Sequence, residues 1–270
     1  MITTIKLLPF FALPKWGLWG LRRSGSSGSL LYPVMNVSLF YRVELYGAVG
    51  RNYGNTERRN DGLFMIKKKL ILASGSPRRK KMFEDLGIEF EIIKSGVDEI
   101  ILKNAMPETV VVENALLKAN AVFKNISGRK EYSNAVVIGA DTIVVMGDGK
   151  KSRFEIIGKP ESGDDARRIL RSLSDSVHYV YTGLAVIDVS SGKKLTGYGK
   201  STVRMKKLSS DEIEGAAVKH LDKAGAYGIQ EEEDAFVTIL EGDKDNVVGL
   251  PMRKLIELLK KLGIRLDLLE

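Results

Sequence analysis

The sequence contains no cysteine and only two histidines, His178 and His220. The lack of cysteine excludes disulfides, thiolate nucleophiles and cysteine-ligated metal sites, and it fits an intracellular protein. A three-histidine metal site is excluded as well. Any bound metal must therefore depend on carboxylate ligands, which favours Mg²⁺ or Mn²⁺ over Zn²⁺.

Long apolar runs are also missing at the start of the chain. The stretch Leu7–Leu13 is apolar but short, and Pro9 and Pro14 interrupt it. It falls well below the roughly 18–20 residues that a membrane helix needs. It also lacks the longer apolar region and small-residue cleavage site of a secretory signal. We therefore expect a cytoplasmic protein that does not associate with membranes.

The positive charge is unevenly distributed. The whole chain carries a net charge of +8, and residues 1–64 account for +5 of it, with eight Lys/Arg against three Asp/Glu. The remainder carries 8 − 5 = +3. A basic protein invites a nucleic-acid interpretation. Because most of the excess lies in a segment unlike the rest, nucleic acid is not the favoured partner.

The composition changes at Met65. Residues 1–64 hold both tryptophans and a Gly/Ser-rich stretch at Ser24–Ser29, with no sustained helical or strand period. From Met65 a basic lead-in is followed by a short apolar strand ending at Ser74. We predict that Met65 is the functional start. Residues 1–64 would then be an extension, disordered or outside the native protein, and residues 65–270 a single domain.

From Met65 onward, strand and helix patterns alternate. Predicted strands cover 69–74, 90–96, 135–146 (broken at 139–142) and 235–240, with a hairpin formed by 178–189 and 195–207. Predicted helices cover 77–86, 107–123, 162–173 and 251–262, and a capping box at Ser209–Glu212 opens one more. This order indicates an α/β or mixed α+β fold with a central mixed sheet.

The segment Ser74-Gly-Ser-Pro-Arg-Arg79 follows a buried strand and opens a helix. Free N–H groups at a helix start attract anions, and the Ser74 and Ser76 hydroxyls add donors. Arg78 and Arg79 supply fork-shaped donors that match phosphate oxygens. The alternative is a Ser cap followed by solvated basic residues on an exposed helix face. The pattern by itself supports the two interpretations about equally.

Asp141 lies in Ile138-Gly-Ala-Asp-Thr142, inside an otherwise apolar strand. A carboxylate there is costly unless it is paired or bound to metal. It can coordinate a divalent cation or act as general base on water. The structural alternative is a residue that ends its strand at a bulge, but a functional role is favoured.

Other polar residues give weaker signals. Lys159 precedes a helix and can reach a triphosphate, and Glu99 follows a strand end where carboxylates can meet a metal. Lys118 borders an apolar stripe, and extension to solvent is its more common fate. Gln230 closes Asp222–Gln230, a glycine-rich segment, and its amide can pair with a pyrimidine edge. A structural turn with a surface glutamine is the favoured interpretation of composition alone.

Together these segments resemble the Maf family, the septum-formation-inhibitor-like nucleotide pyrophosphatases. The resemblance runs from about Lys69 to Ile264, and the order of the matching pieces is more specific than any one of them. The pieces are Leu72–Arg79, Glu113 with Lys118, Gly139–Thr142, Gly158–Pro160, Thr182-Gly183, Asp222–Gln230 and Val248–Pro251. The run Asp222–Gln230 looks like the subgroup that acts on dTTP and UTP.

The resemblance implies an elongated, inosine-triphosphatase-like fold with a cleft between two lobes, commonly dimeric. It implies hydrolysis of a nucleoside triphosphate between the α and β phosphates with a divalent metal, Mg²⁺ or Mn²⁺. Asp141 matches the proton acceptor. The specificity positions match Arg78, Thr142 and Gln230, and other site positions match Ser74, Glu99, Lys118 and Lys159. In the expected mechanism the metal, on Asp141 and Glu99, joins Arg78, Arg79 and Lys159 in neutralising the triphosphate.

Two departures and two rival functions accompany this expectation. The family's usual glycines after Gln230 are replaced by Glu231–Asp234, and the loop 149–155 looks extended. One rival is a pyrophosphatase for 7-methyl-GTP or another nucleotide. The other is a nucleic-acid-binding or division-regulating protein. The sequence does not favour it, because the arginines lack the neighbouring aromatic residues that single-strand binders interleave with basic ones.

Overall fold

The computed structural model describes residues 43–48, 56–58, 64–100, 102, 105–147, 154–221, 223–228 and 236–268. Backbone contacts divide the chain into residues 1–38 and residues 39–270. All described residues belong to the second unit. Within these ranges, no helix combines the length and apolar character that crossing a membrane requires.

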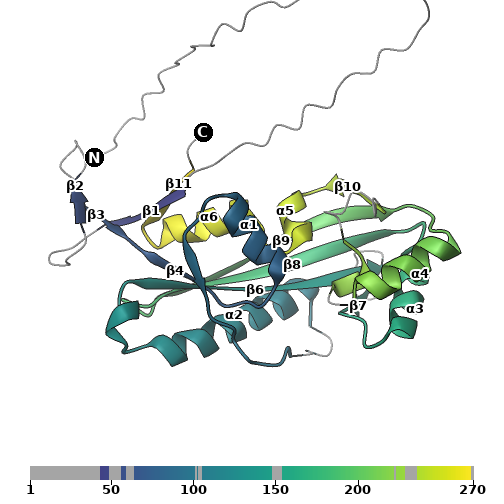
Figure 1. Cartoon of the computed structure of the whole chain (residues 1–270), viewed down its shortest axis with the longest axis horizontal. Helices are drawn as coiled ribbons and strands as arrows, with labels where there is room; N and C mark the ends of the chain where they lie inside the picture. The colour runs from purple at the N-terminus through teal and green to yellow at the C-terminus, as the bar shows by residue number, and fades with distance from the viewer. Residues whose placement is uncertain are drawn as a thin grey trace, which may run out of the picture. The chain divides into compact units, whose positions relative to one another are not determined.

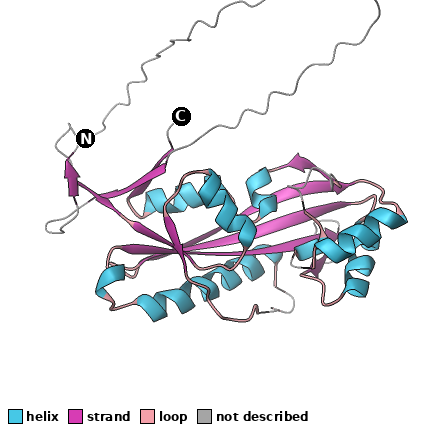
Figure 2. Ribbon diagram, in the orientation of Figure 1, coloured by secondary structure: helices cyan, strands magenta, loops and turns pink. Residues whose placement is uncertain are grey.

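A seven-stranded mixed sheet forms the centre of this unit (Figures 1 and 2). The strand order is β10-β9-β8-β6-β4-β5, and β7 pairs with β6. β4 runs parallel to β5 and β6, whereas β6, β8, β9 and β10 are antiparallel neighbours. The strands are β4 Lys69–Leu72, β5 Phe90–Ile92, β6 Ala135–Gly147, β7 Phe154–Ile157, β8 Val177–Asp188, β9 Lys194–Met205 and β10 Val237–Glu241. The predicted mixed sheet is therefore confirmed.

Helices cover both faces of the sheet, as Figure 1 shows for α2 on one side and α1 and α6 on the other. The helices are α1 Pro77–Asp85, α2 Pro107–Ile126, α3 Gly163–Leu173, α4 Ser210–Lys219, α5 Lys244–Val248 and α6 Met252–Lys261. Alternation along β4 explains the two layers. Leu70 and Leu72 pack in a cluster with residues of α1 and α6, while Ile71 packs with residues of α2.

The predicted elements largely agree with the structure. The hairpin is formed by β8 and β9, and the Ser209–Glu212 capping box has both of its hydrogen bonds. At Ser162, the side chain accepts from Asp165 N at the start of α3. β5 is shorter than predicted, and β7, α5 and β11 Ile264–Leu268 were not predicted.

The predicted break in the third strand is wrong, because β6 continues without interruption through Gly139–Thr142. The glycine serves helix packing instead of a bulge. A Cβ on Gly139 would collide with the carbonyl oxygen of Ala115 on α2. A Cβ on Gly183 in β8 would collide with the carbonyl of Val111. These two glycines let α2 lie directly on the strands.

The segment before the central sheet contains three strands, β1 Val43–Ala48, β2 Thr56–Arg58 and β3 Phe64–Lys67. They form a four-stranded sheet with β11, in the order β11-β1-β3-β2. The predicted boundary at Met65 falls inside β3. The hypothesis that residues 1–64 are dispensable remains a prediction.

Candidate active site

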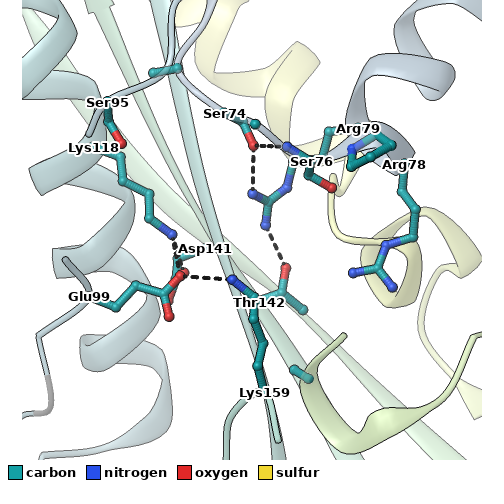
Figure 3. Close-up of a pocket in the computed structure, with 14 residues that line it drawn as sticks. Ser74, Ser76, Arg78, Arg79, Ser95, Glu99, Lys118, Asp141, Thr142 and Lys159 are labelled. Carbon is teal, nitrogen blue, oxygen red and sulfur yellow. Dashed lines mark hydrogen bonds and ion pairs between the residues drawn. The ribbon is translucent and has the colours of Figure 1, made fainter. Parts of the chain in front are cut away.

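A pocket with a volume of about 440 Å³ lies beside the carboxyl end of β4 (Figure 3). This size is within the range of small-molecule sites. Side chains from separate segments of the chain line it, namely Ala73–Arg79, Ser95, Glu99, Lys118, Asp141, Thr142, Lys159 and Ala224. Every predicted site residue that the structure describes is among them. Gln230 and Glu231–Asp234 lie outside the described residues, as does most of the loop 149–155.

The pairing of β4 with β6 explains why these segments meet. The two strands are parallel, and Leu72 at the end of β4 pairs with Ile138. Ala73 N then donates to the Ile138 carbonyl at 2.8 Å. The chain leaving β4 therefore passes alongside Asp141, only three residues beyond Ile138 on β6. This register brings the Ser74–Arg79 segment to the carboxylate.

The start of α1 faces the pocket without a side-chain cap. Ser76 is the N-cap residue, and Pro77 occupies the first helical turn. No side-chain capping hydrogen bond forms there, and the first turn contains no acidic residue. Ser74 Oγ instead accepts from Ser76 N at 3.2 Å. The segment is therefore not a simple Ser cap, because no serine side chain caps the helix. Its uncapped start, without an acidic residue, suits an anion.

Arg79 is largely buried, with 8% of its surface exposed. Its guanidinium donates to the carbonyls of Gly249 at 2.7 Å and Ala140 at 3.0 Å. It also donates to Ser74 Oγ at 3.1 Å and Thr142 Oγ1 at 2.9 Å. These bonds use four of the five N–H groups of an arginine. Arg79 therefore ties α1 to β6 and to the turn after α5.

Burial lowers the pKa of Arg79 to about 10. The Asp141 carboxylate opposes this shift by favouring the charged guanidinium, and the neighbouring Arg78 cation reinforces it. Arg79 remains protonated at neutral pH. Its positive charge therefore contributes to the field in the pocket even though its donors are bound to protein atoms.

A cluster of four charged residues occupies the opposite wall. Lys118 Nζ donates to Asp141 Oδ1 at 2.6 Å and to Glu99 Oε1 at 2.8 Å. Lys159 Nζ lies 3.6 Å from the same oxygen of Glu99. Figure 3 shows Lys118 and Lys159 approaching the two carboxylates from different elements. The four charges balance one another, so Arg78 and Arg79 give the pocket a net charge of +2.

Asp141 is the most buried member of this cluster, with 2% of its surface exposed. Its Oδ1 is bound to Lys118, but its buried Oδ2 has no hydrogen-bond partner among the described residues. A carboxylate oxygen in that condition is costly unless a ligand completes it. Asp141 is therefore poised to accept a proton or to bind a cation.

Glu99 is ionised at neutral pH. Partial burial pushes its pKa upward, but the hydrogen bond from Lys118 and the charges of Lys118 and Lys159 outweigh that effect. The pKa of Glu99 consequently lies below its ordinary value. A negative Glu99 beside Asp141 is a suitable oxygen ligand for a cation.

Lys118 and Lys159 differ in their exposure to solvent. The prediction that Lys118 extends to solvent is wrong, because its side chain is 12% exposed and points into the cluster. Lys159 has a side chain that is 57% exposed at the pocket edge. Glu113, on the same helix as Lys118, is exposed and does not line the pocket.

Sequence reasoning missed Ser95 and Ala224 as pocket residues. Ser95 follows β5, which is parallel to β4, so the two strands end at the same edge of the sheet. That parallel pairing was the signal that could have found it. Ala224 belongs to the glycine-rich segment, whose backbone approaches the pocket: Gly225 N donates to the Gly158 carbonyl at 3.1 Å.

The glycine-rich segment is anchored by Tyr227. Its hydroxyl is hydrogen-bonded to His178 Nε2 on β8 at 2.7 Å, and both side chains are buried. Burial lowers the pKa of His178 to about 4 and raises that of Tyr227. The pair is therefore neutral at physiological pH. It fixes the segment that leads to Gln230.

The donors present fit a hard divalent cation that also binds substrate. Asp141 and Glu99 offer carboxylate oxygens, and Asp141 Oδ2 has no hydrogen-bond partner among the described residues. Mg²⁺ is commonly held by one or two carboxylates together with substrate phosphates. The described residues contain no group of three or more His, Cys, Asp or Glu that could hold a metal by themselves.

The sheet and the pocket together define a small-molecule site for an anionic ligand, with a buried carboxylate next to a helix start. Comparison with known proteins identifies the family. A model described as Maf-like protein matches residues 69–262, and the chain belongs to this family. The matched range contains all residues that line the pocket.

Relatives align over nearly their whole length. The chain is 46% identical over 196 residues to a dTTP/UTP pyrophosphatase of Alkaliphilus metalliredigens, covering 72% of this chain and 96% of that protein. It is 42% identical over 204 residues to a dTTP/UTP pyrophosphatase of Dictyoglomus thermophilum, covering 74% and 100%. A protein of the same name from Bacillus cereus is 43% identical over 199 residues, covering 73% and 91%.

Among solved structures, the Ham1 protein of Staphylococcus aureus is a remote match. It has a TM-score of 0.37 and 15% identity, and the match covers 72% of this chain and 97% of that chain. The similarity is too low to add to the fold described above.

Proposed function

We propose that this protein is a nucleoside-triphosphate pyrophosphatase that hydrolyses dTTP and UTP to the monophosphate and pyrophosphate. Membership of the Maf family supports the proposal, as do relatives of that activity that align over nearly their whole length. The observation that carries it is the buried Asp141 carboxylate, whose Oδ2 has no hydrogen-bond partner in the described part of the chain, in a pocket that is otherwise mainly basic.

The triphosphate binds between the start of α1 and Lys159. Backbone N–H groups of the first helical turn, the Arg78 guanidinium and the Lys159 ammonium donate to phosphate oxygens. Arg79 holds this helix start in place and adds its charge. Donors fixed in this way stabilise the negative charge that develops on the leaving pyrophosphate.

Hydrolysis begins with a water molecule that attacks the α-phosphorus. Its oxygen forms the new bond to phosphorus, and its proton passes to Asp141 Oδ2. The bond between the α-phosphorus and the bridging oxygen breaks, and pyrophosphate leaves with that electron pair. Lys118 holds Asp141 Oδ1, so that Oδ2 faces the water. Proton transfer of this kind typically supplies about 10²–10⁴-fold.

Asp141 and Glu99 would hold Mg²⁺ or Mn²⁺, which supplies further neutralisation of the phosphate oxygens when bound. Glu99 also positions Lys118, because both carboxylates share that ammonium group. The proposal also includes a homodimer, which the family resemblance implies, and a cytoplasmic location.

Substitution of Asp141 tests the proposal. Asp141→Asn removes the proton acceptor with little change in shape, so pyrophosphate release from dTTP and UTP should fall at least about 100-fold. The matched control is Asp85→Asn, an exposed carboxylate on α1 that does not line the pocket. Release is measured with Mg²⁺, with Mn²⁺ and with a chelator, and 7-methyl-GTP is included as a competing substrate.

An active Asp141→Asn enzyme would refute the assignment of the base. Preferential hydrolysis of 7-methyl-GTP would refute the substrate class while leaving the reaction intact. Full activity in the presence of the chelator would refute the requirement for a divalent metal. A thermal melt of both variants separates loss of chemistry from loss of folding.

A further inference from the structure

A line of hydrogen bonds leads from the pocket into the sheet and on to α5. Arg79 Nη2 lies 2.9 Å from Thr142 Oγ1, and Figure 3 shows these two groups facing one another. Thr142 on β6 pairs with Thr182 on β8, and their hydroxyl oxygens are 2.9 Å apart. Thr182 Oγ1 in turn lies 2.9 Å from the Asn246 carbonyl oxygen.

Counting hydrogens fixes the direction of every bond in this line. A carbonyl oxygen only accepts, so Thr182 must donate its single hydroxyl hydrogen to Asn246. Thr182 then has no hydrogen for Thr142, and Thr142 must be the donor between the two threonines. Arginine has only donors, so Arg79 donates to Thr142. The order is Arg79 to Thr142 to Thr182 to Asn246.

This order leaves Thr142 without a hydrogen for a ligand. Its hydroxyl accepts from Arg79, donates to Thr182, and keeps one acceptor position. Thr142 lines the pocket and is partly exposed, whereas Thr182 is fully buried and Asn246 is 1% exposed. Because water does not reach the inner part of the line, Thr182 cannot turn to a solvent partner. Thr142 therefore meets a ligand only as an acceptor, and a phosphate oxygen is excluded as its partner.

We infer that Thr182 is a positioning residue that holds Thr142 as a hydrogen-bond acceptor, so that the pocket selects a hydrogen-bond donor on the nucleoside. This inference rests on the proposed function. Uracil and thymine share an imide N–H, and cytosine has an acceptor nitrogen at that position. The sugar 3′-hydroxyl is the other donor that dTTP and UTP share. Because the Thr142 hydroxyl can only accept, it discriminates against a ligand that presents an acceptor at that point, since both acceptor atoms would lack a hydrogen-bond donor.

The test compares kcat/KM for UTP, CTP and 3′-deoxy-UTP in the parental enzyme, Thr182→Val and Thr182→Ser. With an imide donor, the parental enzyme and Thr182→Ser prefer UTP over CTP. In Thr182→Val the ratio of kcat/KM for UTP to that for CTP should fall about tenfold, because the Thr142 hydroxyl can then turn its hydrogen toward cytosine. If the donor is the sugar 3′-hydroxyl, the ratio of kcat/KM for UTP to that for 3′-deoxy-UTP should fall about tenfold instead.

Unchanged preferences in a folded, active Thr182→Val enzyme would overturn the inference. If that variant does not fold, Thr142→Val replaces it, since Thr142 is partly exposed and the Thr182–Asn246 bond is kept. Thr142→Val should lower kcat/KM for UTP and narrow the same preference, and an unchanged preference again overturns the inference.

Failure of the proposed function gives a different result. In that case the parental protein releases no pyrophosphate from any nucleotide. Calorimetric binding of UTP, CTP and 3′-deoxy-UTP to the parental protein and to Thr182→Val then tests, without hydrolysis, whether the Thr142 hydroxyl acts only as an acceptor. Tighter parental binding of UTP than of one analogue, lost in Thr182→Val, supports the inference. Equal binding in both proteins overturns it.

Discussion

The charged residues of the pocket fall into those that hold the site and those that face a ligand. Arg79 and Lys118 spend their donors on protein oxygens. Arg78 and Lys159 lie at the pocket with more of their surface accessible. Charge alone does not separate these roles, since all four are basic and line the same cavity. The degree of burial separates them, since Arg79 is buried and Lys118 nearly so, whereas Arg78 is half-buried and Lys159 is exposed.

The buried His178 makes stability depend on pH. Its pKa is about 4 in the folded protein, because burial disfavours the charged ring, against about 6.5 in an unfolded chain. As the pH falls from 6.5 toward 4, the unfolded state takes up a proton that the folded state does not. The folded state should therefore lose about 3 kcal/mol over this range from His178 alone.

Urea unfolding at several pH values between 7 and 4.5 measures this effect. His178→Gln keeps an amide that can bond to Tyr227 but does not titrate, so its stability should decline less on acidification. Carboxylates titrate equally in both proteins and cancel in the difference. If the free energy of unfolding falls equally in the two proteins on acidification, His178 is not the group that causes the loss of stability.

Sequence analysis found the pocket residues that stand in short, distinctive segments. Ser74–Arg79 and Asp141 could be predicted because polar groups there interrupt apolar strands. The role of Lys118 could not be derived from its helix alone, because its partner carboxylates come from distant parts of the chain. The direction of the Thr142 hydrogen bonds needed the cross-strand pairing with Thr182, which the sequence does not specify.

At the scale of elements, α2 determines where Lys118 lies. The helix contacts β6 and β8 through Gly139 and Gly183, whose missing side chains allow its backbone to approach closely. The sequence pattern predicted α2 and β6 but not this contact. Gly139 was instead interpreted as part of a break, since glycine in a strand also marks bulges. Only the packing distinguishes the two uses.

Replacing Gly139 should therefore affect catalysis through the helix. Gly139→Ala places a Cβ against the Ala115 carbonyl and forces α2 away from β6, which displaces Lys118 from Asp141. Displacement of a positioning group by about 1 Å costs on the order of 100-fold in rate. We expect kcat for UTP to fall by that order, measured at a temperature where the variant is folded.

Gly215→Ala on α4 is the matched control, because a Cβ there meets nothing within 4 Å. It should leave kcat unchanged and add about 0.5–1 kcal/mol of helix stability. Equal kcat values for the two variants would contradict the role of α2 in placing Lys118.

At the scale of the whole molecule, the pocket and the seven-stranded sheet lie entirely after Met65. The family model begins at residue 69. The mixed sheet and its helices could be predicted because apolar periods mark each element. The pairing of β1 with β11 could not, since strands so distant in sequence carry no local signal of their partner.

A protein that starts at Met65 should keep its activity. Because no pocket residue is removed, kcat/KM for UTP should stay within about twofold of that of the full chain. β11 loses its partner β1, so the midpoint of thermal unfolding should fall. A second truncation that starts at Leu39 keeps β1 and should retain both activity and midpoint. Loss of activity only in the shorter protein would show that residues 39–64 support the site.

The central claim is that water attacks the α-phosphorus in this pocket with Asp141 as its base. The most direct measurement is hydrolysis of UTP in water labelled with oxygen-18, followed by mass spectrometry of both products. The account predicts one labelled oxygen in UMP, unlabelled pyrophosphate, and labelled UMP formed at least about 100-fold more slowly by Asp141→Asn. Label in the pyrophosphate, or labelled UMP formed at the parental rate by Asp141→Asn, would contradict it.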